Sequence, residues 1–187
     1  KEYDGLLYAE RLGRAMGKCD TSGNFIRYMA IYDEDASIRE KVVIALGGTG
    51  NSSAIDTLKI VLLNNEETPT IRKAAATALG KLGGPNAIWW LKNVAVHGDE
   101  VSQDIREAAA TELVNIGEPA IEALEKDANG KICVYERCRI KAIKILGDIG
   151  GPEAIKVLAI LLTDKNEVIW KAALRAIAVA NQQGISE

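Results

Sequence analysis

Residues 71–91 read IRKAAATALGKLGGPNAIWWL and contain one complete structural unit. Apolar residues recur in its first half with the spacing of a single helix face, at Ile71, Ala75, Leu79 and Leu82. Gly83 can adopt the left-handed backbone conformation that closes a helix, and Pro85 suits the first turn of a new one. The stretch therefore predicts a tight pair of antiparallel helices.

The same unit recurs along the chain with a nearly constant period. Its first helix carries an arginine in four copies and a tryptophan in the fifth, at Arg39, Arg72, Arg106, Arg139 and Trp170. These positions are 33, 34, 33 and 31 residues apart, a period typical of helical solenoids. Residues 8–13, YAERLG, form a looser first copy. The sequence therefore predicts an all-α fold: a right-handed α-solenoid of stacked antiparallel helix pairs, with about five repeats plus a terminal helix.

We expect residues 1–187 to form a single repeat domain. The predicted repeats span residues 4–32, 33–65, 66–98, 99–131 and 132–164, followed by a partial repeat at 165–187. Trp170 belongs to the last helix, whose apolar tail leaves two interpretations open. Either this helix caps the solenoid, or the chain is a fragment of a longer array.

An acidic residue stands six positions before most of the repeat arginines. These acids are Asp33, Glu66, Glu100 and Asp164, and Cys133 takes the place in the fourth repeat. Loop carboxylates can hold helix arginines through charge-assisted hydrogen bonds. We therefore predict a ladder that ties successive repeats together, made of these acids with Arg39, Arg72, Arg106 and Arg139. The alternative is a solvated acidic loop near each helix N-terminus.

The repeat resembles the short HEAT-like repeat of phycobilisome-lyase-type HEAT proteins. The shared pattern is an acid, Ile/Val-Arg, Ala-Ala, Ala-Leu-Gly, Gly-x-Pro-x-Ala-Ile and a final leucine, and residues 71–91 carry it best. The match covers residues 33–180 in outline, which is most of the chain. Because this repeat serves as a scaffold for many tasks, the resemblance implies the fold more strongly than the function.

In HEAT-type folds the second helices line the concave side, so the resemblance implies that a partner binds there. The residue after each Ala-Ile pair is charged in three repeats, as Asp56, Glu122 and Lys156, but is Trp89 in another. A tryptophan among charged equivalents is a candidate anchor for a partner. We predict a partner-binding face that comprises Asp56, Trp89, Trp90, Lys92, Glu122 and Lys156. The alternative is that Trp89 folds over Trp90.

Composition excludes several classes of function. The 187 residues are 48% hydrophobic and carry a net charge of −3, which argues against a disordered chain and against nucleic acid as a partner. We expect no membrane association, because no apolar run approaches the roughly 18 residues of a membrane helix. We expect a cytoplasmic location. The basic residues of the fourth repeat, Lys131, Arg137, Arg139, Lys141 and Lys144, are interpreted as a solvated helix face.

Catalytic and metal-binding residues are scarce. The chain has one histidine, His97, which we expect in a solvated loop. Its cysteines, Cys19, Cys133 and Cys138, make neither a disulfide framework nor a zinc site, and with no histidine near them neither Cys133 nor Cys138 is expected to act as a nucleophile. The sequence therefore predicts no enzymatic activity, no metal and no cofactor.

Two classes of function follow from this sequence. The first is a non-enzymatic protein–protein interaction scaffold that binds a partner in its concave groove. The alternative rests on the resemblance alone: a phycobilin-lyase-type subunit or chromophore chaperone that handles a tetrapyrrole and its acceptor protein. In that alternative, the aromatic patch would stack on the bilin and an arginine would pair with its propionates.

Overall fold

The computed structural model describes residues 20–183, and this part of the chain is helical, with no strand. Its helices are α2 (Asp20–Tyr32), α3 (Ala36–Gly47), η1 (Ser52–Ala54), α4 (Ile55–Leu63), α5 (Pro69–Leu82), α6 (Gly84–Lys92), the π-helical η2 (Asn93–His97), α7 (Gln103–Ile116), η3 (Glu118–Ala120), α8 (Ile121–Ala128), α9 (Glu136–Ile149), α10 (Gly151–Leu161) and α11 (Glu167–Gln183). Residues 8–13, Cys19 and much of the predicted repeat 4–32 lie outside the described residues.

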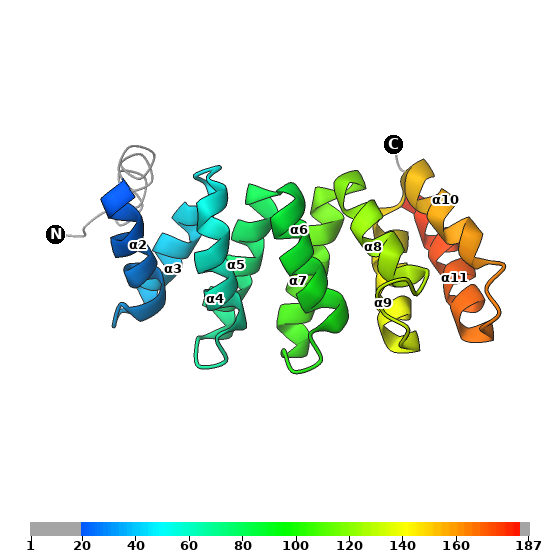
Figure 1. Cartoon of the computed structure of the whole chain (residues 1–187), viewed down its shortest axis with the longest axis horizontal. Coiled ribbons are helices and arrows are strands. Elements are labelled where there is room, and N and C mark those ends of the chain that lie inside the picture. Colours follow the sequence, from blue (N-terminus) through cyan, green and yellow to red (C-terminus); the bar gives the residue numbers. More distant parts are fainter. Residues whose placement is uncertain (1–19, 184–187) are drawn as a thin grey trace.

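The helices stack side by side into an α-solenoid (Figure 1). Helices α3, α5, α7, α9 and α11 form one row, which we call the first-helix row, and α2, α4, α6, α8 and α10 form the second-helix row. A positive-φ glycine separates the two helices of a pair, as at Gly83 between α5 and α6 and Gly150 between α9 and α10, with φ of 60° and 68°. The predicted glycine helix stops are therefore confirmed at these positions.

The hydrophobic core is a continuous layer between the two rows. Both rows contribute fully buried leucines, namely Leu58, Leu79, Leu91, Leu113, Leu124, Leu146 and Leu158. Each helix pair thus buries one apolar face against its own partner and against the neighbouring pair. Among residues 20–183, no helix combines the length and hydropathy that a membrane-spanning segment needs.

Small residues let neighbouring first helices approach closely. A Cβ atom added at Gly47 would lie 2.6 Å from the Cα atom of Ala78, and one added at Gly147 would lie 2.8 Å from the Cβ atom of Ala176. Both glycines stand eight positions after the repeat arginine. In α7 the same position is Val114, so the close approach that a glycine permits is not available there.

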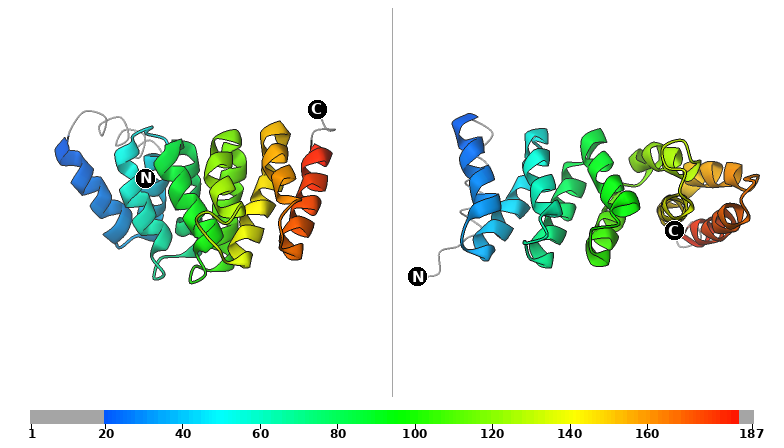
Figure 2. Two further views of the ribbon diagram at one scale, coloured as in Figure 1. Left: turned by 45° about the vertical axis from the view of Figure 1, so that its right-hand side comes forward. Right: turned by 60° about the horizontal axis from the view of Figure 1, so that its bottom comes forward.

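The direction of the helices changes where this glycine is missing. In the right-hand view of Figure 2, the helices up to α7 are seen from the side, whereas α9 is seen nearly end-on. The stack therefore turns between α7 and α9. We refer to this place as the α7–α9 junction.

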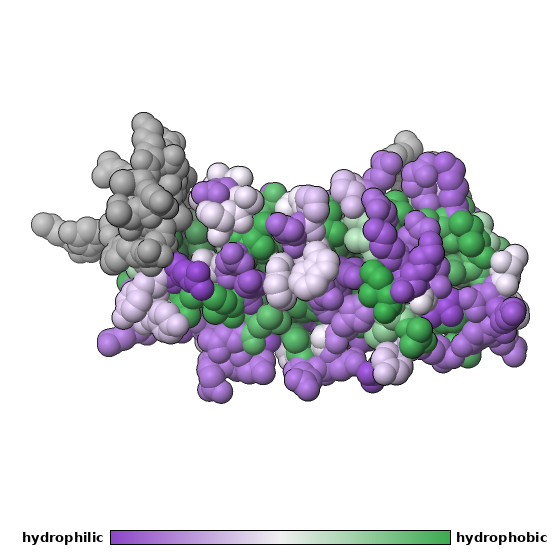
Figure 3. Space-filling view, viewed as in Figure 1, coloured by the Kyte–Doolittle hydropathy of each residue, from purple (hydrophilic) through white to green (hydrophobic). Residues whose placement is uncertain are grey.

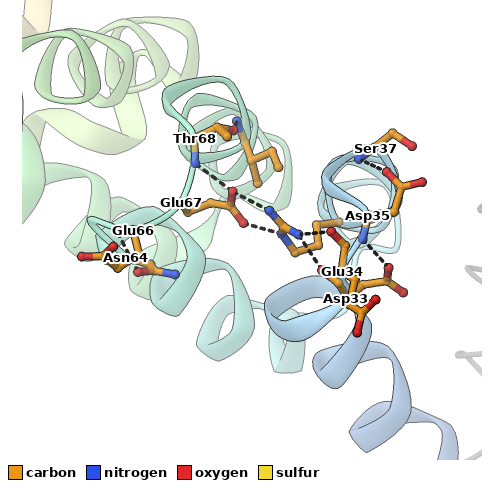
Figure 4. Close-up of polar contacts among 10 residues, drawn as sticks. Asp33, Glu34, Asp35, Ser37, Asn64, Glu66, Glu67 and Thr68 are labelled. Atoms are coloured by element: carbon orange, nitrogen blue, oxygen red, sulfur yellow. Dashed lines mark hydrogen bonds and ion pairs between the residues drawn. The ribbon is translucent and has the colours of Figure 1, made fainter.

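An ion pair links α3 to the loop before α5. Arg39 donates from Nε to Glu67 Oε2 at 2.6 Å and from Nη2 to Glu67 Oε1 at 3.0 Å, and it also donates to the carbonyl of Asp33 (Figure 4). Glu67 accepts a further hydrogen bond from the backbone N–H of Thr68 at 2.7 Å. The hydrogen bonds from Arg39 hold the pKa of Glu67 below its ordinary value.

A second inter-repeat ion pair lies near the other end of the chain. Arg139, on α9, donates to the carboxylate of Asp164, in the loop before α11. Its Nε also donates to the carbonyl of Ala128 at the end of α8, at 2.8 Å. One arginine thus joins α9 to the end of α8 and to the loop before α11.

The ladder prediction is wrong for three of the acids. Asp33 uses its carboxylate to accept from the backbone N–H of Asp35, at 2.9 Å, and Glu66 and Glu100 are exposed. Glu67 is used in place of Glu66 because the backbone N–H of Glu67 closes a turn onto Asn64, which leaves Glu66 at the solvent side of that turn.

Two of the predicted ladder arginines bond to backbone carbonyls instead of carboxylates. Arg72 is buried and donates to the carbonyl of Leu62 at 2.9 Å. Arg106 donates to the carbonyl of Val101. The ladder is therefore interrupted at both interfaces of α7.

The close approach of α3 and α5 predicts that Gly47 does not tolerate a side chain. We expect Gly47→Ala to lower the free energy of unfolding by about 1–3 kcal/mol, because its methyl group would force the two helices apart. Gly48→Ala is the matched control, since a Cβ there meets only the Ala45 carbonyl oxygen, at 3.5 Å, and should change stability by no more than about 0.5 kcal/mol. Urea unfolding followed by circular dichroism measures both, and equal effects would contradict the proposed contact.

The Arg39–Glu67 pair predicts a pH-dependent contribution to stability. At neutral pH we expect Glu67→Gln to lower the free energy of unfolding by about 1–3 kcal/mol, whereas Glu66→Gln should have little effect. Because the folded-state pKa of Glu67 is depressed, its contribution is present above the unfolded-state pKa of about 4.3 and is lost as pH falls through the folded-state value. Urea unfolding of the three proteins between pH 7 and pH 3.5 should show the wild type approaching Glu67→Gln. A pH-independent difference would argue against this pair.

Candidate functional site

Two tryptophans on α6 form an exposed aromatic pair. Their ring centroids lie 4.7 Å apart in a T-shaped arrangement, and 51% of the Trp89 surface remains accessible. Trp90 is half-buried, and the Nζ atom of Lys59, on α4, lies 5.1 Å from its ring centroid. Trp89 therefore contacts Trp90 and still presents half of its surface to solvent.

Helix geometry explains why Trp89 points outward. The neighbouring residues Ala87, Ile88 and Leu91 are buried and form the core-facing stripe of α6. Trp89 lies outside this stripe, on the solvent side of the second-helix row. The T-shaped contact with Trp90 supports the Trp89 ring on its inner side.

The charged residues predicted at the equivalent positions are exposed, one on each of three other second helices. Each has an ion-pair partner on its own helix: Asp56 with Lys59, Glu122 with Lys126 and Lys156 with Glu153. Only the Asp56–Lys59 pair lies against the aromatic pair, through the Lys59–Trp90 contact. The structure therefore does not gather all the predicted residues into one site.

Lys92 is not a surface residue, and its predicted place in the binding face is wrong. It is 3% exposed, and its Nζ lies 2.7 Å from Oδ2 of Asp127, which is fully buried on α8. The last turn of α6 faces α8, so the ammonium group neutralises a carboxylate in the core instead of meeting a partner. Buried pairs of this kind are costly to break, because either charge is then left uncompensated.

His97 extends this buried pair and is not the solvated loop residue that was expected. Its Nε2 lies 3.0 Å from Oδ1 of Asp127, and its side chain is 25% exposed. Lys92, Asp127 and His97 thus form a polar cluster between α6, η2 and α8. We call these three residues the buried polar triad.

Two cysteines lie beside His97. The Sγ atoms of Cys133, in the loop before α9, and of Cys138, in the first turn of α9, lie with a ring nitrogen of His97 within 4.8 Å of one another. The expectation that no histidine is near these cysteines is therefore wrong. Sequence alone did not reveal the group, because 36 residues separate His97 from Cys133 and only the packing of one repeat on another brings them together.

Both thiols are buried, and Cys138 is a poor nucleophile. Burial, with a hydrogen bond to Cys133, raises the pKa of the Cys138 thiol to about 11. A thiol with this pKa is protonated at neutral pH and attacks poorly. Together with His97, the two cysteines can instead bind a metal. Two sulfurs and one imidazole nitrogen are ligands that zinc and other borderline-soft cations select.

The basic residues of α9 are engaged with the same junction. Arg137 lies 2.7 Å from Oδ2 of Asp99, and Lys141 lies 3.1 Å from Oδ1 of Asp99 and donates to the Val96 carbonyl at 3.1 Å. A hydrogen bond from Lys141 lowers the pKa of Asp99. Arg137 and Lys141 therefore tie α9 to the segment that follows α6 and do more than solvate a helix face, whereas Lys131 and Lys144 are exposed, as that interpretation expected.

Hydrophobic side chains also reach the surface outside the tryptophan pair. Ile132, Val134 and Tyr135 are exposed in the loop between α8 and α9, next to the cysteines, and Ile160 is exposed on α10. In Figure 3 hydrophobic atoms come to this face in separate patches among hydrophilic ones. On the first-helix row a shallow groove runs between α9 and α11, lined by Ile140, Ile143, Gly147, Ala176 and Val179 among others.

Comparison with known proteins identifies the repeat. Residues 24–103 match the family model of HEAT repeats. No curated protein matches the chain in sequence.

Several solved structures are similar over most of the chain. The complex of CpcE and CpcF of phycocyanin lyase from Nostoc sp. PCC7120 is 25% identical with a TM-score of 0.46, over 87% of this chain and 66% of that chain. A designed armadillo repeat protein is 16% identical with a TM-score of 0.40, over 94% and 93% of the two chains. Human deoxyhypusine hydroxylase is 15% identical with a TM-score of 0.35, over 95% and 97%. The stacked helix pairs show that the described residues form an α-solenoid, and residues 24–103 of this solenoid match the family model of HEAT repeats.

Proposed function

We propose that this chain is a non-enzymatic protein–protein interaction scaffold whose partner binds on the second-helix row. The observation that carries the proposal is Trp89, which is half exposed at a position where three other repeats have charged residues. Aromatic side chains that sit on a rigid element are typical anchors of protein interfaces. HEAT repeats supply such rigid elements, since each helix is packed on both neighbours.

The size of the exposed indole suits an anchor. A tryptophan offers up to about 250 Å² of surface, so the accessible half of Trp89 is on the order of 120 Å². Burial of that area against an apolar pocket would contribute about 3 kcal/mol at about 25 cal/mol per Å². A contribution of this size is that of an interface hot spot.

The surroundings of Trp89 suit the rim of such an interface. Asp56 and Lys59 on α4 are of opposite sign, as are Glu122 and Lys126 on α8. Charged groups of mixed sign around an apolar centre favour a partner with complementary charges and discourage non-specific association. We therefore expect a folded protein partner with an apolar pocket and a mixed-charge rim.

The tetrapyrrole alternative receives less support. It needs an arginine beside the aromatic pair to bind propionates. The cation that lies over the Trp90 ring is Lys59, and the exposed arginine of this region, Arg27, acts on Asp56 and not on the aromatic pair. We therefore place a protein partner first.

The proposal predicts that removal of one indole weakens partner capture. With the full chain as bait in lysate of its source cells, we expect Trp89→Ala to reduce recovery of the specific partner, with an affinity loss of about 30-fold, or about 2 kcal/mol. Leu174→Ala is the matched control, because Leu174 is an equally exposed apolar residue on α11, in the other row. Crosslinking with quantitative mass spectrometry identifies the partner, and circular dichroism checks that helicity is kept. Equal capture by all three baits would remove Trp89 as the anchor.

A further inference from the structure

We propose that His97, Cys133 and Cys138 bind a zinc ion at the α7–α9 junction, through two thiolate sulfurs and one imidazole nitrogen. The three candidate ligand atoms already lie within 4.8 Å of one another, although they come from η2, from the loop after α8 and from the first turn of α9. No other group of this kind occurs among the described residues. The proposal is independent of the proposed function, because it does not involve Trp89.

The spacing of the ligand atoms fits a tetrahedral metal after a small adjustment. With Zn–S bonds of about 2.3 Å and Zn–N bonds of about 2.0–2.1 Å, tetrahedral ligands lie about 3.5–3.8 Å apart. The observed limit of 4.8 Å exceeds this by about 1 Å. Side-chain rotation of the two cysteines supplies a movement of that size without a change of the backbone.

The buried polar triad orients the histidine for metal binding. Asp127 has only acceptor atoms as a carboxylate, so His97 donates to it from Nε2–H at 3.0 Å. Nδ1 is then the ring nitrogen that carries the free lone pair. A carboxylate that holds the far side of a ligating imidazole is the usual outer-shell arrangement of zinc sites. Lys92 in turn holds the carboxylate, with Nζ 2.7 Å from Oδ2.

The donor set selects the class of cation. Two sulfurs and a nitrogen suit Zn²⁺, whereas Mg²⁺ and Ca²⁺ require oxygen ligands. On binding, the ion forms two Zn–S bonds and one Zn–N bond, and both thiol protons leave to solvent. The gain of one dication and the loss of two protons leave the net charge of the site unchanged. With three protein ligands, the fourth position is left for a water molecule.

The place of the cluster gives the ion a structural role. At this junction Val114 stands where other repeats have a glycine, and Cys133 stands where they have an acidic residue six positions before the arginine. The close glycine–alanine contact and the arginine–carboxylate pair are thus both missing here. A metal that joins η2 to α9 would add a different link at this junction, from the predicted repeat 66–98 to the predicted repeat 132–164.

Titration of the reduced, metal-free full chain tests the proposal. With Zn²⁺ we expect one ion bound per chain, with release of two protons measured by calorimetry in buffers of different ionisation enthalpy. With Co²⁺ as a spectroscopic substitute we expect a thiolate-to-cobalt charge-transfer band in the near ultraviolet and the intense visible bands of tetrahedral coordination. The midpoint of thermal unfolding should rise with added Zn²⁺.

Matched variants separate this site from chance binding. Loss of an outer-shell partner typically weakens metal binding by about 10- to 100-fold. Cys133→Ser and His97→Gln each remove a ligand, so each should weaken Zn²⁺ binding by more than this. Glu66→Gln should bind like the wild type, because Glu66 is exposed in the loop before α5. Circular dichroism of each variant establishes that the fold is kept. The proposal is overturned if the reduced chain shows no thiolate–cobalt band, if Cys133→Ser binds as tightly as the wild type, or if Cys133 and Cys138 form a disulfide that excess Zn²⁺ does not prevent.

Discussion

Close contact between neighbouring first helices is the constraint on which the rest of this structure depends. A single helix pair cannot bury both of its apolar faces, so each pair is stable only against the next. Gly47 against Ala78 and Gly147 against Ala176 bring the backbones together, and the leucines between the two rows then fill a continuous core. The Arg39–Glu67 and Arg139–Asp164 pairs lie beside these contacts and fix how one repeat sits on the next.

The α7–α9 junction solves the same problem with different chemistry. Valine replaces glycine at position 114, and the arginines at both interfaces of α7 bond to carbonyl groups. Polar contacts lie beside the hydrophobic core here: the buried polar triad between α6, η2 and α8, and the ion pairs of Asp99 with Arg137 and Lys141. The absence of the close glycine–alanine contact agrees with the turn of the stack at this point (Figure 2).

A scaffold of this kind separates stability from binding. The core and the inter-repeat ion pairs stabilise the stack, so the solvent side of the second-helix row is free to carry residues that contribute little to folding. Trp89 is such a residue, since half of its surface is unburied although Trp90 and Lys59 support the pair. The cysteine–histidine cluster belongs with the groups that stabilise the stack, because it lies inside the stack and brings together segments of different repeats.

The sequence by itself determined the repeat, the helix pairs and their glycine boundaries, because each follows from local periodicity or from comparison of equivalent positions, whereas it left open whether Trp89 is exposed or folds over Trp90. Only the tertiary structure decided which charges meet. Glu67 pairs with Arg39 where Glu66 was expected, and Lys92 is buried where a surface residue was expected. The meeting of His97 with Cys133 and Cys138 was also invisible in sequence. These outcomes depend on one-residue differences in loop direction and on how repeats stack, and a periodic pattern encodes neither.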